Sequence, residues 1–258
     1  MMRIAAFQMK AVAADQAANL ARIEKAAREA SADGAELLVA PELALPGYGS
    51  GDDMRNLAEP PGGEIVAKLT LISLDARIAI LAGFAEAAEG SIYNSAVFAD
   101  GRKEPVIYRK SHLYGDYERD MFAAELPSAC IVEHGGLRIG ILICYDVEFP
   151  ENVRRLAQAG ADLVAVPTAL PASDHAELIA RKMIPVRAFE NQVFVAYVNN
   201  CGADDLFSYA GLSAVAAPDG NLLAEADETS ETLLFADIRP QDFAASAAAN
   251  PYLRDLRL

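Results

Sequence analysis

The sequence is poor in the residues that disulfide scaffolds, metal centres and nucleic-acid interfaces require. Its 258 residues include three cysteines, three histidines and no tryptophan, and 22 Lys and Arg stand against 37 Asp and Glu, a formal net charge of −15. We expect no binding to nucleic acid or to an anionic membrane surface, because both need a basic face. Three separated cysteines cannot all pair, so reduced thiols in a cytosolic protein are expected. Three scattered histidines without ligand spacing predict no metal site.

Long hydrophobic runs are missing as well. The most apolar stretch, residues 139–145, is far too short to span a bilayer. The first eight residues contain no long apolar run and no cleavage signal, so a soluble cytoplasmic protein is expected. In contrast, 53% of the residues are hydrophobic and 23% are charged, which is typical of a folded chain. The length allows one large domain or two small ones.

Short apolar runs alternate with helical patterns along the chain. Pro41 and Pro167 are expected to end strands, and Pro185 must kink a helix or begin a new one inside it. The two halves share a similar strand–helix order. This order predicts an α/β fold of two packed sheets with helices outside, a four-layer α-β-β-α sandwich forming one domain over residues 1–258. The pattern alone also allows a doubly wound sheet. Strands are predicted at 4–7, 36–40, 78–84, 92–98, 106–108, 137–143, 163–166, 193–198, 212–217, 221–226 and 232–236, and helices at 20–30, 62–76, 150–159 and 175–191.

Three ionisable side chains follow predicted strands. Glu42 comes two residues after the strand at 36–40, Lys110 two residues after the strand at 106–108, and Cys144 directly after the strand at 137–143. Ligands in α/β sheets bind outside the carboxyl ends of strands, so these residues are candidates for one site. Each alone has a simpler interpretation, as a solvated turn residue, an edge-blocking charge and an inert core thiol. Their shared structural context favours a common site.

A cysteine, a glutamate and a lysine together can hydrolyse an amide. Glu42 can take the thiol proton of Cys144, pass it to the leaving ammonia and then activate the hydrolytic water. Lys110 can oppose the charge of the oxyanion and lower the thiol pKa, and the backbone N–H of Tyr145 can donate to the same oxygen. The intermediate is a thioester acyl-enzyme that water cleaves.

The segments around these residues resemble the three signatures of the nitrilase superfamily of carbon–nitrogen hydrolases. The resemblance runs from Arg3 to about Asp237. It implies a Cys-Glu-Lys hydrolase on an α-β-β-α sandwich, without metal or organic cofactor, that forms a homodimer or a larger homo-oligomer. We expect residues 238–258 to be a C-terminal tail that contacts a partner subunit. The shared motifs are Pro-Glu-Leu-Ala-Leu-Pro-Gly-Tyr at 41–48, Ile-Tyr-Asn-Ser at 92–95, Tyr-Arg-Lys-Ser-His-Leu at 108–113, Ile-Cys-Tyr-Asp-Val-Glu-Phe-Pro-Glu at 143–151, Gly-Ala-Asp-Leu at 160–163, Val-Pro-Thr-Ala at 166–169 and Arg-Ala-Phe-Glu-Asn-Gln at 187–192.

The amidase branch of this superfamily has a second glutamate eight residues after the lysine, which is Glu118 here. The resemblance implies that Glu118 positions the substrate amide and stabilises Lys110. A buried lysine needs such a partner, and two carboxylates keep it protonated while one can still accept a proton. The alternative is a single charge in an exposed acidic loop. Tyr145-Asp146 stands where nitrilases typically have Trp-Glu, which favours an amide over a nitrile. The chain looks most similar to bacterial aliphatic amidases, among them amidases of 5-aminopentanamide and stereoselective amino-acid-amide amidases.

Further residues are assigned supporting roles. Four are expected to contact the small-molecule amide substrate: Tyr48, Tyr145, Thr168 and Ala169. Asn94 is expected to line or brace the site, His112, Asp146 and Arg187 to be structural, and Cys130 and Cys201 to be bystander thiols.

The favoured function is an amidase that hydrolyses a small aliphatic carboxamide, including an ω-amino amide, to the acid and ammonia. Two alternatives stay open from the sequence. The first is an N-carbamoyl amine hydrolase of the same superfamily, and the second is an amide-binding module without turnover.

Overall fold

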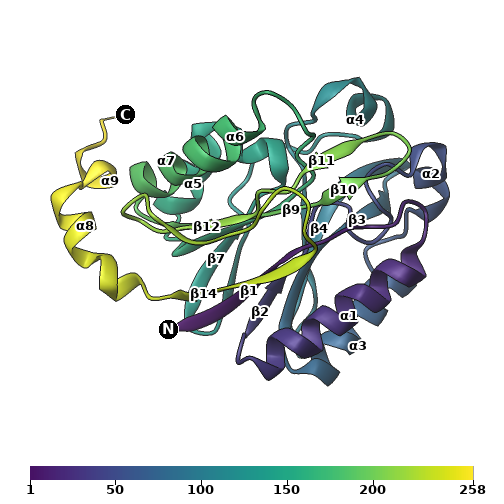
Figure 1. Cartoon of the computed structure of the whole chain (residues 1–258), viewed down its shortest axis with the longest axis horizontal. Helices are drawn as coiled ribbons and strands as arrows, with labels where there is room; N and C mark the ends of the chain where they lie inside the picture. The colour runs from purple at the N-terminus through teal and green to yellow at the C-terminus, as the bar shows by residue number, and fades with distance from the viewer. Residues whose placement is uncertain (258) are drawn as a thin grey trace.

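Two six-stranded sheets pack face to face in the computed structural model, which describes residues 1–257 (Figure 1). The first sheet has the strand order β14-β1-β2-β3-β4-β5. β1, β2 and β3 run parallel, and the other neighbours run antiparallel. Its strands are β1 Met2–Gln8, β2 Leu37–Val39, β3 Ala79–Ala88, β4 Ser91–Ala99, β5 Val106–Arg109 and β14 Thr232–Ile238.

The second sheet has the order β13-β12-β9-β8-β7-β6. Here β7, β8 and β9 run parallel, and their neighbours run antiparallel. Each sheet therefore contains three consecutive parallel strands. The strands are β6 Ile131–His134, β7 Leu137–Ile141, β8 Leu163–Thr168, β9 Phe194–Asn199, β12 Ala214–Ala216 and β13 Leu222–Glu225.

Helices cover the outer face of each sheet. α1 Gln16–Ala32 and α3 Glu64–Ala76 lie on the first sheet, and α5 Pro150–Gln158 and α7 Ile184–Asn191 lie on the second (Figure 1). α1 begins where the Asp15 side chain accepts from Ala18 N at 2.9 Å. Its apolar face, with Ile23, Ala27 and Ala30 buried, packs on the outer side of the first sheet. The predicted α-β-β-α sandwich is confirmed.

The prediction that Pro167 ends a strand is wrong. β8 continues to Thr168, and Pro167 pairs in register with Val198 of β9. The backbone groups of successive β8 residues point alternately toward β7 and toward β9. Ala165 O accepts from Leu142 N, after β7, while Thr168 O accepts from Asn200 N, after β9. The backbone nitrogen of Pro167 therefore points toward β7. The pairing between β8 and β7 has already ended at Ala165. No N–H is needed there, so proline is tolerated.

Other elements differ from the sequence pattern in ways that matter for the site. Pro185 is the second residue of α7 Ile184–Asn191, which follows α6 Ala176–Leu178 and a π-helical turn at Ile179–Met183. The pattern missed several short elements whose sequences have no clear period and that depend on tertiary contacts. They are η1 Gly51–Asp53, α2 Met54–Leu57, α4 Gly115–Met121, β6, the 3₁₀ helix η2 Cys144–Glu148, β10 Cys201–Ala203 and β11 Ser208–Ala210.

The chain ends in η4 Pro240–Phe243, α8 Ala244–Ala249 and α9 Tyr252–Asp255. This tail folds back onto the second sheet and α7, since Phe243 stacks edge-on against Phe194 and Tyr252 against Phe189. Its contact with a partner subunit and the single domain over 1–258 stay predictions, and Leu258 lies outside the described residues. None of the helices in residues 1–257 is long and apolar enough to cross a membrane.

Candidate active site

Glu42 lies on a tight turn whose position depends on Gly83. After β2, the backbone at Leu43 adopts a left-handed φ of 46°. Gly83 of β3 holds this turn from both sides, donating to Pro41 O and accepting from Leu45 N, each at 3.1 Å. A Cβ at Gly83 would lie 2.1 Å from Leu43 N. Only glycine allows the turn to approach β3 this closely, and that approach fixes the place of Glu42.

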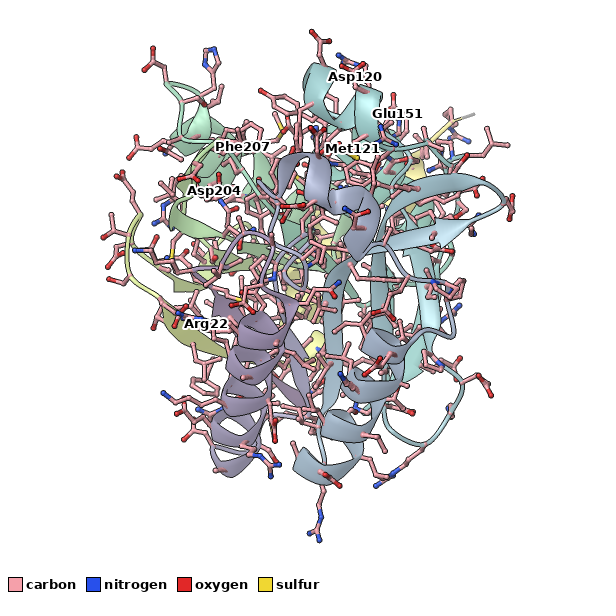
Figure 2. All side chains as sticks on the ribbon, turned by 90° about the vertical axis from the view of Figure 1, so that its right-hand side faces the viewer. Arg22, Asp120, Met121, Glu151, Asp204 and Phe207 are labelled. Carbon is pink, nitrogen blue, oxygen red and sulfur yellow. The ribbon has the colours of Figure 1, made fainter. Side chains whose placement is uncertain are left out.

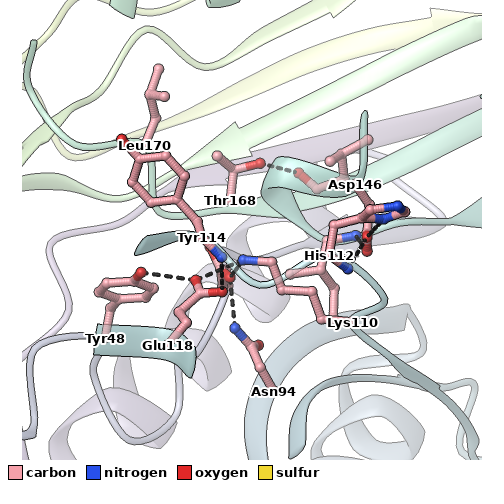
Figure 3. A network of polar contacts seen from close by, with 12 residues as sticks. Tyr48, Asn94, Lys110, His112, Tyr114, Glu118, Asp146, Thr168 and Leu170 are labelled. Carbon is pink, nitrogen blue, oxygen red and sulfur yellow. Dashed lines mark hydrogen bonds and ion pairs between the residues drawn. The ribbon is translucent and has the colours of Figure 1, made fainter. Parts of the chain in front are cut away.

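Lys110 joins Glu42 and Glu118 in one buried cluster, of which Figure 3 shows Lys110 and Glu118 with the neighbouring Tyr48 and Asn94. Its Nζ lies 2.6 Å from Glu42 Oε1 and 2.7 Å from Glu118 Oε1. All three side chains have 0% of their surface exposed. Lys110 comes from the end of β5 and Glu118 from α4, so three separate elements meet here. Burial excludes the alternative that Glu118 is an exposed loop charge.

The two carboxylates of this cluster differ in how many hydrogen bonds they accept. Glu118 uses both oxygens, because Oε1 also accepts from the Tyr48 hydroxyl and Oε2 accepts from Tyr114 N, each at 2.8 Å. Glu42 Oε1 accepts from Lys110 and from Asn94 Nδ2 at 2.7 Å. Glu42 Oε2 is buried and has no hydrogen-bond partner among the described residues. Glu42 thus has a free acceptor atom inside the site, and Glu118 has none.

The surroundings also set the protonation of the cluster. Burial raises the pKa of Glu42 to about 7, with the attraction of Lys110 opposing and the repulsion of Glu118 assisting. Burial lowers the pKa of Lys110, but Glu118 and Glu42 outweigh it and hold that pKa well above its usual value. Lys110 therefore stays an ammonium while Glu42 can exchange a proton near neutral pH.

Cys144 begins the η2 turn, three residues after β7 ends at Ile141. Its φ is 44°, a left-handed conformation that is strained for a residue with a side chain. The side chain keeps 6% of its surface exposed. Burial and the charge of Glu42 raise the pKa of the thiol well above its usual value, although Lys110 and the Ala169 N–H lower it. Lys110 thus acts in the expected direction, but the net result is a protonated thiol at rest rather than a preformed thiolate.

Asp146 ties the Cys144 turn to the segment that carries Lys110. Its buried carboxylate accepts from the hydroxyls of Tyr108 at 2.9 Å and Ser111 at 2.7 Å, and from His112 N at 2.9 Å. The same carboxylate lies 2.9 Å from His112 Nδ1. His112 stacks on Phe149 with ring centroids 3.9 Å apart. Asp146 and His112 are therefore structural, as expected, and no hydrogen bond joins His112 to Cys144 within residues 1–257.

The four residues predicted to contact substrate differ in their surroundings. Tyr48 is buried and braces Glu118. Tyr145 is half-buried and packs edge-on against Tyr114 at 5.3 Å. Thr168 is buried, and its hydroxyl donates to Val166 O at 2.9 Å. Ala169 presents its N–H to the Cys144 thiol.

Aromatic side chains from distant loops enclose this end of the molecule. Tyr48 packs against Tyr117 of α4 and Phe207 of the β10–β11 hairpin, with centroids 5.6 and 5.3 Å apart. Phe207 and Tyr117 also contact each other at 5.0 Å. In Figure 2, Phe207 and Asp204 of the hairpin and Asp120 and Met121 of α4 all lie in the upper half of the molecule. The rings of Tyr48, Tyr117 and Phe207 thus form an aromatic group directly beside Glu118, whose Oε1 accepts from the Tyr48 hydroxyl.

Three residues near the site were missed by sequence reasoning. Asn200 Nδ2 donates to Glu42 O at 3.3 Å, and it follows β9, so the strand-end rule that selected Glu42 would have found it. Gly83 gives no such signal, because only the packed turn shows that a Cβ cannot fit. Glu148 ends the η2 turn that begins at Cys144 and is half-buried.

Cys130 and Cys201 are free thiols in the structure, like Cys144. Burial raises the pKa of Cys130 and of Cys201 to about 11, and neither belongs to the cluster around Lys110. In the part of the chain that the structure describes, no group of three or more His, Cys, Asp or Glu side chains could hold a metal ion.

The chain is similar to known hydrolases over its whole length. The model of the family described as carbon-nitrogen hydrolase matches residues 3–248. The "Hydrolase in pqqF 5′ region" of Pseudomonas protegens is 42% identical, with 99% of this chain and 89% of that protein covered. An (R)-stereoselective amidase of Pseudomonas sp. is 34% identical, with 100% and 92% covered. The solved structure of an amidase from Nesterenkonia sp. AN1 superposes with a TM-score of 0.88 at 33% identity, with 100% of this chain and 97% of that chain covered.

Proposed function

The chain belongs to the carbon–nitrogen hydrolase family, and we propose that it is an amidase for small aliphatic carboxamides that reacts through a thioester on Cys144. Its membership and its amidase relatives make it a hydrolase of non-peptide carbon–nitrogen bonds in amides. The proposal adds the class of amide and the residue roles. The observation that carries the roles is the free Oε2 of Glu42, next to a Glu118 whose oxygens are all in use.

The first step is attack by the thiol. Glu42 Oε2 removes the proton of Cys144, and Sγ forms a bond to the carbonyl carbon of the amide while the carbonyl π electrons move to its oxygen. Lys110 Nζ and the backbone N–H of Tyr145 stabilise the oxyanion. Because the resting thiol is protonated, the charge develops only when the carbonyl is present to receive the electrons.

The second and third steps return the enzyme to its resting state. The protonated Glu42 gives its proton to the amide nitrogen, the carbon–nitrogen bond breaks, and ammonia leaves behind a thioester. Glu42 then removes a proton from water, whose oxygen attacks the thioester carbon. The acid is released as Sγ leaves and regains the proton from Glu42. Glu118 and Tyr48 take no proton in this cycle and instead hold Lys110 charged and in place.

Small aliphatic amides fit the enclosed surroundings of the cluster. Cys144 has only 6% of its surface exposed, and Tyr48 and Phe207 narrow the space around Glu118. A variant of the Nesterenkonia amidase has been solved in complex with butyramide, which supports a short unbranched acyl chain. Among such amides we include those with a terminal amine, as the resemblance to aliphatic amidases suggests.

The test is release of ammonia by the purified chain from amides of two to six carbons. We expect turnover of the short amides by wild type and none above background by Cys144→Ala with its fold intact. Absence of ammonia from every short amide would overturn the substrate class. Release of carbon dioxide together with ammonia from an N-carbamoyl amine, with no activity on simple amides, would instead identify a carbamoyl hydrolase.

A further inference from the structure

Glu148 is an unpaired carboxylate on the same turn as the nucleophile. The η2 turn runs from Cys144 to Glu148. With a 3₁₀ rise of about 2 Å per residue, the two Cα atoms lie within about 8 Å of each other along the turn. The Glu148 side chain is half-buried. Its carboxylate makes no hydrogen bond or ion pair with any residue that the structure describes. Its backbone is fixed, because Arg187 donates to Glu148 O at 2.6 Å.

The two cations near Glu148 are already bound elsewhere. Lys110 is held by Glu42 and Glu118. Arg187 donates to the carbonyls of Val147 and Glu148 and pairs with Glu190 at 3.0 Å. Burial raises the pKa of Glu148, and the attraction of Lys110 and Arg187 opposes this without reversing it. A half-buried carboxylate without a partner costs free energy that a bound cation would recover.

The position of Glu148 relative to the site is supported by Tyr197. The buried Tyr197 of β9 has a pKa raised by burial, and the negative charges of Cys144 as a thiolate, Glu148 and Glu42 raise it further. Tyr197 therefore lies within electrostatic range of both ends of the η2 turn. Glu148 also lies within electrostatic range of Lys110, whose ammonium contacts Glu42 Oε1 at 2.6 Å.

We propose that the Glu148 carboxylate binds the terminal ammonium of an amino-amide whose carboxamide lies at Cys144. This inference rests on the proposed amidase function and adds the residue that selects the far end of the substrate. An acyl chain of about four to six carbons matches the separation of about 8 Å between the backbone positions of Cys144 and Glu148. An ion pair formed there replaces the missing partner of Glu148 and discriminates against amides that end in a methyl group.

Other carboxylates at this end of the molecule are less suited to the role. Asp52, Asp53, Asp116 and Asp174 are all exposed, and Asp116 already pairs with Arg119 at 3.2 Å. Ion pairs at such solvated positions contribute little to binding. Glu148 differs from them in being half-buried, unpaired and fixed at its backbone by Arg187.

The experiment compares 5-aminopentanamide with pentanamide, which share a chain length and differ in the terminal charge. Wild type is expected to have the higher kcat/KM for the amino-amide. Glu148→Gln should reduce the ratio of the two kcat/KM values at least tenfold, mainly through KM. The control is Glu151→Gln, an exposed carboxylate of α5 (Figure 2) whose loss should not change the ratio.

The outcomes separate the inference from the proposed function. An unchanged ratio in Glu148→Gln, or no preference for the amino-amide in wild type, overturns the role of Glu148 while the amidase function stands. Absence of ammonia from both amides overturns the proposed substrate class. In that case calorimetry on Cys144→Ala still decides the inference, because 5-aminopentanamide must bind at least tenfold more weakly when Glu148→Gln is added.

Discussion

Lys110 donates to Oε1 of Glu42 at 2.6 Å, and the second oxygen of the same carboxylate has no partner within residues 1–257. Glu42 is thus held in place by the ammonium group of Lys110 and keeps one free oxygen that can accept a proton. Glu118, bonded to the same Nζ at 2.7 Å, has no such acceptor. The division of roles between two neighbouring carboxylates follows from this difference, and it gives the predictions below.

The pH dependence of kcat/KM should report Glu42. The base must be ionised to accept the thiol proton, and burial raises the pKa of Glu42 to about 7. Activity should therefore fall as the pH decreases through about 7. Deprotonation of Lys110 should not affect kcat/KM near neutral pH, because the pKa of Lys110 is held well above its usual value. A profile that stays flat from pH 8 down to pH 5 would contradict the assignment of Glu42.

Removing the charge of Glu118 should move this profile. The charge of Glu118 raises the pKa of Glu42, so Glu118→Gln should shift the acid limb of kcat/KM to lower pH. We also expect kcat to fall about 10²-fold, because Lys110 loses one of its two carboxylates. Tyr48→Phe, which deletes a hydrogen bond to Glu118 but no charge, is the matched control and should leave the limb in place. If the acid limb of kcat/KM lies at the same pH in wild type and in Glu118→Gln, the charge of Glu118 does not act on Glu42. Glu118 would then only stabilise the start of α4, where it accepts from Tyr114 N.

A methyl group at Gly83 should displace the Glu42 turn. The new Cβ would meet Leu43 N at 2.1 Å, so the backbone must move. Overpacking of this kind costs about 1–3 kcal/mol of stability, and a displacement of about 1 Å costs about 10²-fold in kcat. Gly62→Ala is the control, since a Cβ there meets no atom within 4 Å. Thermal unfolding and kcat of both variants test the prediction, which fails if they behave alike.

Asp146→Asn should weaken the link between the Cys144 turn and the Lys110 segment. The carboxylate accepts from Tyr108, Ser111 and His112 in a buried site, and an amide offers one acceptor oxygen in place of two. We expect the free energy of unfolding to fall by about 2–4 kcal/mol, as for other buried networks. Denaturant titration measures this. A loss below about 0.5 kcal/mol would mean that the network does not fix the turn.

Much of the fold was predictable from the sequence because its strands are buried runs and its long helices are amphipathic. The similar order of the two halves favoured two packed sheets but also allowed a doubly wound sheet, and the family resemblance favoured the sandwich. The short elements α4 and β10–β11 were not predictable, since their polar or irregular sequences fold only against Tyr48 and its neighbours. The prediction for Pro167 was wrong because the sequence does not show where the pairing of β8 with β7 ends. Only the positions of both neighbouring strands show that no N–H is needed at Pro167.

The candidate site, like the fold, was predictable from the sequence only in part. Glu42, Lys110 and Cys144 were found because each follows a strand, and the structure brings the two charged residues together within hydrogen-bond distance. Glu118 came from the family resemblance, because its helix gives no pattern. The left-handed backbone of Cys144 and the free oxygen of Glu42 depend on packing between distant segments. No local rule could have supplied them.

The acyl-enzyme on Cys144 is the central claim, and intact-mass analysis of acid-quenched enzyme tests it most directly. During turnover of butyramide, wild type should carry one butyryl group, located by peptide mapping on the fragment that contains Cys144. Cys144→Ala should carry none and release no ammonia. An acyl group on Cys130 or Cys201, or ammonia released at the wild-type rate by Cys144→Ala, would contradict the account.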